Sequence, residues 1–420
     1  MSSISFMEKL LDGYQVQWKT LGEVAEYSPT RVDAAELDAT SFVGVDNLIA
    51  EKGGRVDANY FPNTVRLTAY EQGDILLGNI RPYLKKVWSA TNSGGCSGDV
   101  LAVRILSKFK KTLDSDFLYY LLSSDEFFSY NMQHAKGAKM PRGDKSAILN
   151  YKIPIPCPEN PEKSLEIQAE IVRILDAFAE LTAELIAELT GELTALKKQY
   201  NYYRDALLNF EEGDLEWKTL GEIGDFTYGY AAKAQDSGGG RFVRITDINS
   251  DGKLISTDSK YVELSQENAK YLLKKNDLLM ARTGATYGKT MIFEEDYPAI
   301  YAGFLIKLSF DKKIINPKFY WHFAQSDLFW SQANKLVSGG GQPQFNANVL
   351  KDVRIPIPHP SDPEKSLAKQ AYVVAILDKF DQISSSLSVG LTREINLRQK
   401  QYEHYRDLLL SFPKPEDVAA

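Results

Sequence analysis

Two stretches of the chain carry apolar residues at helical spacing over an exceptional length. In the first, they recur at intervals of three or four residues from Phe178 to Leu207. Shifted by 202 residues, the same rhythm runs from Phe380 to Leu409, interrupted only by Arg398. This spacing is typical of a coiled-coil seam that contains a stutter. It predicts two long helices that pack against each other in antiparallel orientation, the alternative being that each packs only on its own domain.

The predicted seam residues are Phe178, Leu181, Leu185, Leu189, Leu193, Tyr200, Tyr203 and Leu207 in the first helix, and Phe380, Ile383, Leu387, Leu391, Ile395, Tyr402, Tyr405 and Leu409 in the second. Each helix has a clear start signal. Asn160 and Asp362 are good N-caps, and the prolines that follow them suit the first helical position.

Between these helices the pattern changes to short apolar runs separated by glycine-containing turns, such as "DILLGNI" and "AGFLIKLSF". Such runs predict strands, and amphipathic stretches near residues 115–130 and 316–333 predict helices after them. The fold class is therefore α+β, with two similar modules and a pseudo-two-fold internal repeat. The predicted domains are the first module at 1–160, a central helical region at 161–213, the second module at 214–362 and a distal helical region at 363–420.

The two copies of the repeat have diverged unevenly. "IPIPCPENPEKSLEIQAEIVRILDAF" (153–178) and "IPIPHPSDPEKSLAKQAYVVAILDKF" (355–380) are identical at 17 of 26 positions. The helix ends "QYNYYRDALLNF" (199–210) and "QYEHYRDLLLSF" (401–412) share 8 of 12. The modules before each connector retain little beyond "WKTLGE", whose Thr-x-x-Glu predicts a capping box in each copy. Similar connectors and unlike modules suggest two readers that recognise different things.

The chain resembles the specificity subunit of type I restriction-modification systems over essentially its full length. The motifs that carry this resemblance are "PEKSL…Q…IL…F" after "IPIP" and "QY…YRD.LL.F", each present twice. The resemblance implies two target-recognition domains that read the unlike halves of an interrupted double-stranded DNA site. It also implies that the connectors bind two methyltransferase subunits, through which restriction and translocase subunits join. S-adenosylmethionine, ATP and magnesium would then belong to the partners, and the start of the chain would dock beside its end.

Composition limits the other possibilities. The net charge of −7 is concentrated in residues 161–216, which hold 5 Lys and Arg against 13 Asp and Glu, so the modules are close to neutral. Two distant cysteines argue against a disulfide framework. No apolar stretch is long enough for a membrane span or resembles a secretion signal, and we expect a cytoplasmic protein without a membrane partner.

Catalytic and metal sites are not indicated. "GATYGKT" (284–290) is one residue short of a phosphate-binding loop, and a strand pattern follows it where such a loop needs a helix. The histidines show no ligand spacing. We predict a non-catalytic DNA-recognition protein. A coiled-coil scaffold with two protein-binding modules is the main alternative, and a degenerate methyltransferase is a third.

DNA contact needs Arg and Lys for phosphates, and Arg, Lys, Asn and Gln for base edges. Two loops in each module supply them. The candidates are Asn79, Arg81, Tyr83, Lys85, Lys86, Lys136, Lys139, Arg142 and Lys145 in the first module, and Arg282, Thr283, Tyr287, Lys289, Gln342, Gln344 and Asn346 in the second. The repeated Arg-Asp step, at Arg204, Asp205, Arg406 and Asp407, lies off the seam and is our candidate for contact with the methyltransferase.

Overall fold

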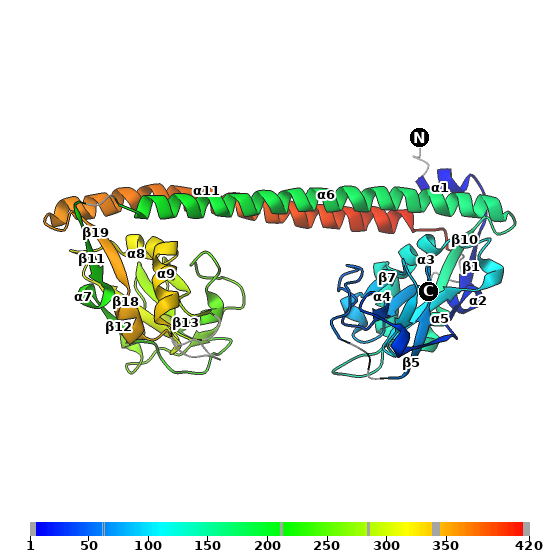
Figure 1. Cartoon of the computed structure of the whole chain (residues 1–420), viewed down its shortest axis with the longest axis horizontal. Helices are drawn as coiled ribbons and strands as arrows, with labels where there is room; N and C mark the ends of the chain where they lie inside the picture. Colours follow the sequence, from blue (N-terminus) through cyan, green and yellow to red (C-terminus); the bar gives the residue numbers. More distant parts are fainter. Residues whose placement is uncertain are drawn as a thin grey trace. The chain divides into compact units, whose positions relative to one another are not determined.

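The computed structural model of the 420-residue chain describes residues 6–60, 62, 64–210, 213–283, 286–337 and 345–414. The chain divides into two compact units, Met1–Glu188 with Arg393–Ala420, and Leu189–Thr392. Each unit contains one β-rich module together with the N-terminal part of one long helix and the C-terminal part of the other (Figure 1). The predicted mixture of strands and helices in two repeats is confirmed.

The first unit begins with a short helix and a β-rich module and continues into the first long helix. Its elements are α1 (Phe6–Leu11), β1 (Val16–Thr20), α2 (Leu21–Val24), β2 (Ala25–Tyr27), β3 (Arg31–Asp33), β4 (Phe42–Val43), β5 (Arg66–Tyr70), β6 (Ile75–Gly78), the 3-10 helix η2 (Pro82–Leu84), β7 (Val87–Ser89), β8 (Gly94–Cys96), β9 (Val100–Ile105), α3 (Ser115–Leu122), α4 (Asp125–Gln133), α5 (Lys145–Asn150), β10 (Lys152–Pro156) and the start of α6 (Pro161–Leu208).

The second unit repeats this order. Its elements are the end of α6, then β11 (Leu215–Thr219), α7 (Leu220–Ile223), β12 (Gly224–Tyr228), β13 (Gly240–Val243), β14 (Tyr261–Val262), β15 (Asp277–Ala281), β16 (Thr290–Phe293), β17 (Ala299–Tyr301), β18 (Leu305–Phe310), α8 (Pro317–Phe323), α9 (Asp327–Leu336), α10 (Ala347–Lys351), β19 (Arg354–Pro358) and the start of α11 (Pro363–Leu409).

The larger sheets of the two modules share one topology despite their different sequences, whereas the smaller sheets, β3-β5-β8-β4 and β14-β13-β17, have only a parallel pair in common. The antiparallel order β2-β9-β6-β7 in the first module corresponds to β12-β18-β15-β16 in the second. The parallel pair β4 and β8 corresponds to β13 and β17. A separate antiparallel ribbon, β1 with β10 or β11 with β19, brings the start of each module to the "IPIP" segment that leads into the long helix. The repeat therefore preserves a frame rather than a sequence.

Local capping signals act as the sequence predicts. The Glu23 carboxylate accepts the Thr20 backbone N–H at 2.6 Å and so closes the capping box of α2. The amphipathic stretch at 115–130 forms two helices, α3 and α4, instead of one. The break occurs where the Ser124 hydroxyl accepts the Phe127 N–H and caps α4. Ser326 does the same for α9.

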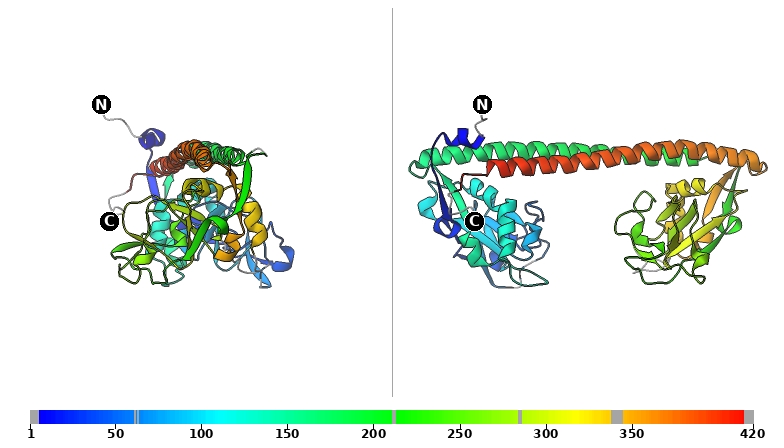
Figure 2. Two further views of the ribbon diagram at one scale, coloured as in Figure 1. Left: turned by 90° about the vertical axis from the view of Figure 1, so that its left-hand side faces the viewer. Right: turned by 180° about the vertical axis from the view of Figure 1, so that it is seen from behind.

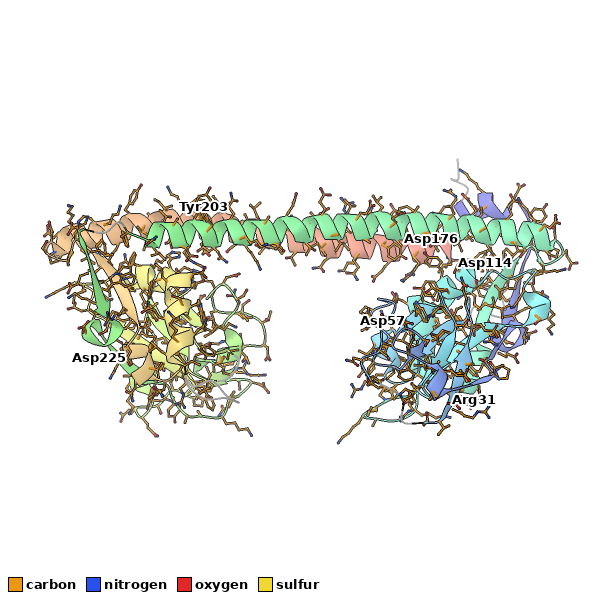
Figure 3. All side chains as sticks on the ribbon, in the orientation of Figure 1. Arg31, Asp57, Asp114, Asp176, Tyr203 and Asp225 are labelled. Carbon is orange, nitrogen blue, oxygen red and sulfur yellow. The ribbon has the colours of Figure 1, made fainter. Side chains whose placement is uncertain are left out.

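The long helices pack on each other through aromatic residues of the predicted seam. In the first unit, Phe178 stacks on Tyr405 with ring centroids 5.4 Å apart. In the second, Tyr203, labelled in Figure 3, stacks on Phe380 at 5.3 Å. Each contact joins the N-terminal part of one helix to the C-terminal part of the other, so the pairing within each unit is antiparallel. Between these contacts the seam is shallow, and Ile383 remains 56% exposed.

The deepest helix burial is on a face that the seam prediction does not include. Gln168 is fully buried, and its side chain accepts the Asp114 N–H at 2.9 Å while donating to the Thr112 carbonyl at 2.8 Å. Gln370 repeats both bonds, to the Asn316 N–H at 2.8 Å and the Ile314 carbonyl at 3.0 Å. Each glutamine thus fastens its helix to the backbone of its own module, and we refer to these contacts as the glutamine clamps.

The core of the first unit joins the beginning and the end of the chain. Met7 and Leu11 of α1 belong to the same buried cluster as Leu409 and Phe412. The Trp18 indole N–H donates to the carbonyl of Pro413 at 2.9 Å. Figure 2 shows α1 beside the long helices of this unit. The expectation that the start of the chain docks beside its end is confirmed.

We expect Gln168→Leu to lower the free energy of unfolding of the first unit by about 1–3 kcal/mol. The substitution removes the acceptor of the part-buried Asp114 N–H and leaves the Thr112 carbonyl with the Ser164 hydroxyl, at 3.3 Å, as its remaining side-chain donor. Glu166→Gln, two residues earlier on the exposed face of the same helix, should change stability by less than about 0.5 kcal/mol. Denaturant unfolding of the purified chain measures both. Equal, small effects of the two variants would show that the clamp does not stabilise the fold.

Candidate nucleic-acid interface

The two candidate loops of the first module lie against each other. The Arg81 N–H donates to the Pro141 carbonyl at 2.7 Å, and the Gly143 N–H donates to the Asn79 carbonyl at 3.1 Å. Lys136 and Arg142 exchange backbone hydrogen bonds across the second loop. Residues separated by about 60 positions in the sequence therefore form one surface, which we call the first loop pair.

Close approach of these loops requires a small residue at position 143. A Cβ on Gly143 would lie 2.8 Å from the Asn79 side-chain oxygen and 2.5 Å from that of Asn131. Both of these oxygens are buried and have no hydrogen-bond partner. The side chain of the candidate Asn79 is thus held inside the loop pair rather than presented at its surface.

Several other candidates of the first loop pair do reach solvent. Arg81 and Lys85 both have left-handed backbone conformations, with φ of 52° and 50°, and flank η2. Because non-glycine residues rarely adopt this conformation, the turn stores strain, which is often found at functional sites. It leaves Tyr83 48% exposed. Lys139 is also exposed.

Of the remaining basic candidates of the second loop, Arg142 and Lys136 pair with acidic residues, and Lys145 is exposed. Arg142 contacts Asp99 at 3.3 Å, with about half of its side chain exposed. Lys136 pairs with Asp144, which also caps α5. Lys145 is an exposed residue in the first turn of that helix.

Two lysine candidates have structural partners. The Lys86 ammonium donates to the Val45 carbonyl at 2.7 Å. Lys85 pairs with Asp125 at 2.9 Å, and the same carboxylate accepts Lys52 at 2.8 Å and Arg406 at 3.1 Å. Arg406 belongs to α11, so this group of three cations around one carboxylate connects the loop, the start of α4 and the long helix within the first unit.

The corresponding segments of the second module also meet. The Phe345 N–H donates to the Arg282 carbonyl at 2.8 Å. The Arg282 guanidinium lies 4.8 Å from the ring centroid of Tyr228 and 5.6 Å from that of Phe304. These rings are 43% and 60% exposed. Sequence reasoning missed both aromatic residues because only the folded sheet brings them to Arg282. Exposed aromatic rings beside a cation can stack on bases and contact phosphate.

The other candidates of the second module have mixed surroundings. Tyr287 packs on Trp330 and donates to the Asn334 side chain at 2.9 Å. Asn346 caps α10 by accepting two backbone N–H groups, so its carbonyl oxygen already has a structural role. Thr283 and Lys289 are half-buried. The candidates Gln342 and Gln344 lie outside the described residues.

The arginines of the repeated Arg-Asp steps are buried in their own units, whereas Asp205 is half-buried and Asp407 is exposed. Arg406 is 2% exposed and pairs with Asp407 at 2.8 Å as well as with Asp125. Arg204 is 6% exposed, and Asp205 instead accepts the backbone N–H of Asp327 at 2.9 Å. These residues thus have intramolecular contacts, which differ between the two copies, and their contact with the methyltransferase stays a prediction.

The described residues contain no group of three or more His, Cys, Asp or Glu side chains arranged to hold a metal ion. Within the same part of the chain, none of the helices combines the length and the apolarity that crossing a membrane requires.

Comparison with known families agrees with the repeat. The chain matches the family described as "Type I restriction modification DNA specificity domain" twice, over residues 16–195 and 212–397. The two matches span most of both units. The chain belongs to this family, and it is a non-catalytic protein of DNA sequence specificity.

Individual relatives align over nearly the whole chain. The type I restriction enzyme EcoR124I/EcoR124II specificity subunit of Escherichia coli is 35% identical, and the alignment covers 100% of both chains. A putative type I restriction enzyme specificity subunit of Haemophilus influenzae, S.HindORF215P, is 31% identical, with 97% of this chain and 98% of the relative covered. A solved structure described as "Structural basis underlying complex assembly and conformational transition of the type I R-M system" has the same fold, with a TM-score of 0.68 at 18% identity over 94% of this chain and 97% of that one.

We expect Asp125→Asn to destabilise the first unit by about 1–3 kcal/mol at pH 7, because Arg406 and two lysines lose a charged acceptor. Although partial burial raises it, the hydrogen bonds from Lys52 and Lys85 bring the pKa of Asp125 well below its usual value. A lowered folded-state pKa gives stability that is present above about pH 4 and is lost as pH falls. The difference between wild type and variant should therefore shrink between about pH 5 and pH 3.

The matched control is Asp57→Asn. Asp57, labelled in Figure 3, pairs with Arg55 but is 61% exposed, so its loss should cost less than about 0.5 kcal/mol. Denaturant unfolding at pH 7, 5 and 3 measures these differences. A difference for Asp125→Asn that did not depend on pH would contradict the assigned ion pairs.

Proposed function

We propose that the chain reads an interrupted double-stranded DNA target, with each module reading one half. One observation carries this proposal: the same frame in both units brings together two loops whose sequences differ. In the first module the loops join through Arg81 and Pro141, and in the second through Arg282 and Phe345. A preserved frame with unlike loops suits two readers that recognise different sequences.

We further propose that two methyltransferase subunits bind the repeated helical regions, and that restriction subunits join the assembly through them. The support is the identity of exposed as well as buried positions in the two connectors. Ala371 and Gln401 repeat Ala169 and Gln199, although all four residues are exposed and lie away from the helix starts. Internal packing does not explain their identity, whereas binding the same protein twice does. The domain boundaries proposed for this arrangement are 1–160, 161–213, 214–362 and 363–420.

Among the candidates, exposure and free hydrogen-bonding capacity favour a smaller set for direct contact. In the first module these residues are Arg81, Tyr83, Lys139 and Arg142. In the second we favour Arg282, with Tyr228 and Phe304 as stacking surfaces. Gln342 and Gln344 stay candidates for base contact, since a glutamine amide can pair with adenine.

Exchange of residues 25–150 for the corresponding segment of a relative should change one half of the methylated motif and leave the other half and the gap unchanged. These limits keep both strands of the β1–β10 ribbon and the whole of α6. The readout is methylome sequencing of cells that carry the hybrid with its methyltransferase. The reciprocal exchange of residues 224–352 is the matched control and should change only the other half. A motif altered in both halves by one exchange would contradict separate readers.

Lys139→Ala should weaken binding to all duplexes and reduce the salt dependence by up to about 0.9 in the slope of log K against log salt, because a phosphate contact is lost. Gln344→Ala should instead cost about 1–3 kcal/mol on the cognate half-site and little on unrelated DNA. Lys110→Ala is the control, since Lys110 lies beside Leu165 of the long helix rather than in the loops.

Binding is measured with the chain assembled with its methyltransferase, on cognate and random duplexes at several salt concentrations. If Lys110→Ala and Lys139→Ala had equal effects, the loop pair would not be the phosphate-contacting surface. Equal losses on both duplexes for Gln344→Ala would exclude this residue from base reading.

A further inference from the structure

The second unit contains a cavity of about 530 Å³ between the end of α6 and the module. This volume is within the range of small-molecule binding sites. Its polar lining includes Asn201 and Arg204 of α6, Ser250 and Gln325 of the module, and the turn that carries Thr286 and Lys289. Two of the described lining residues are cations and none is acidic. Such a lining is suited to an anion.

Arg204 brings to this cavity a charge that no direct ion pair balances: the guanidinium lies 5.4 Å from the ring centroid of Tyr200, and Asp205 and Asp327 favour its charge only from a distance. Arg204 is 94% buried, which follows from its 6% exposure, and its Nε has no hydrogen-bond partner. One terminal nitrogen donates to the Asn201 side-chain oxygen at 3.0 Å. Among the described residues, no carboxylate lies within 4.0 Å of the guanidinium. A buried cation without a counter-ion is unfavourable, so a bound anion would relieve a cost already present in the folded chain.

The equivalent arginine of the first unit has counter-ions within the chain. There the equivalent arginine, Arg406, is neutralised by Asp125 and Asp407 at 3.1 and 2.8 Å. Lys85 reaches the same carboxylate from a left-handed position of the turn. Aligned with a shift of 203 residues, Lys85 corresponds to Gly288, which is also left-handed, with φ of 72°. The second module therefore has a glycine in the cavity lining at the position where the first module has a lysine.

Acidic residues near Arg204 do not occupy this cavity. Asp205 is directed to the backbone N–H of Asp327, as described above. Asp251 and Asp381 line a separate, smaller hollow that shares Arg204 with the first one. Asp205 and Asp327 thus favour the charge of Arg204 without forming an ion pair with it, and Lys289 adds a second cation to the lining of the cavity.

We propose that this cavity binds a phosphate group, held by the charges of Arg204 and Lys289. The site is distinct from base reading, and only its assignment to the DNA backbone rests on the proposed DNA function. The phosphate comes either from a small, freely diffusing phosphate compound or from the backbone of bound DNA, because both present the same charged oxygens.

Equilibrium dialysis of the full chain with radiolabelled inorganic phosphate, at constant ionic strength in chloride buffer and without DNA or methyltransferase, tests the proposal. We expect one saturable site per chain. Arg204→Gln should weaken binding at least about tenfold, because a charged hydrogen-bond donor contributes about 1.5–3 kcal/mol. Lys289→Gln should weaken it in the same direction. Lys335→Gln, an exposed cation of α9 outside the lining, is the charge-matched control and should leave binding unchanged.

Circular dichroism and thermal unfolding in chloride show whether each variant folds. If Arg204→Gln does not fold, the binding of phosphate to Lys289→Gln decides the test. Absence of saturable binding to wild type, or binding that persists in folded variants of both cations, overturns the proposal. Addition of duplex DNA then identifies the source of the phosphate. Displacement by DNA assigns the site to the DNA backbone, and continued binding assigns it to a small phosphate compound.

Discussion

The arrangement of each unit depends on a buried polar contact between a helix and a loop backbone. Gln168 and Gln370 each satisfy one N–H and one carbonyl of the segment that leads into the helices of their module. Ser164 and Ser366 accept from these glutamines at 2.9 and 3.2 Å and are themselves buried. Because an unpaired polar group in such a position is costly, the helix has one favourable register on its module. The loops that we propose as DNA contacts inherit their position from this register.

This contact also gives a second reason for the similarity of the two connectors. Partner binding was the first explanation, but the "S…Q" of "PEKSL…Q" is required by the fold of each unit. A third anchor shows how much variation the frame allows. Tyr120 donates to Asp176 at 2.5 Å in the first unit, whereas His322 contacts Asp378 at 2.9 Å at the equivalent place in the second. The acceptor on the helix is kept, and the donor on the module has changed with the rest of the module.

The charges around the repeated buried arginine differ between the two units. In the first unit three cations surround Asp125, so the loop, α4 and α11 are held together electrostatically. In the second unit the corresponding lysine is Gly288, and Arg204 faces a cavity instead. Two copies of one frame thus use the same buried arginine differently, as an internal ion pair in one and as a candidate ligand site in the other. The net negative charge of the chain does not oppose DNA binding, because it is concentrated in residues 161–216 rather than in the loops.

The sequence by itself determined the repeat, the two long helices with their caps and the α+β character of the modules. These features are local or periodic, and a single pattern of spacing or capping residues specifies each of them. The tertiary structure decided which residues within those patterns are exposed and free to contact a ligand. Lys85 and Lys86 are of a residue type that commonly contacts phosphate. In the folded chain, however, Lys85 pairs with Asp125 and Lys86 donates to the Val45 carbonyl. The glutamine clamps, the aromatic rings beside Arg282 and the cavity at Arg204 join residues distant in the chain, and no local pattern encodes such contacts.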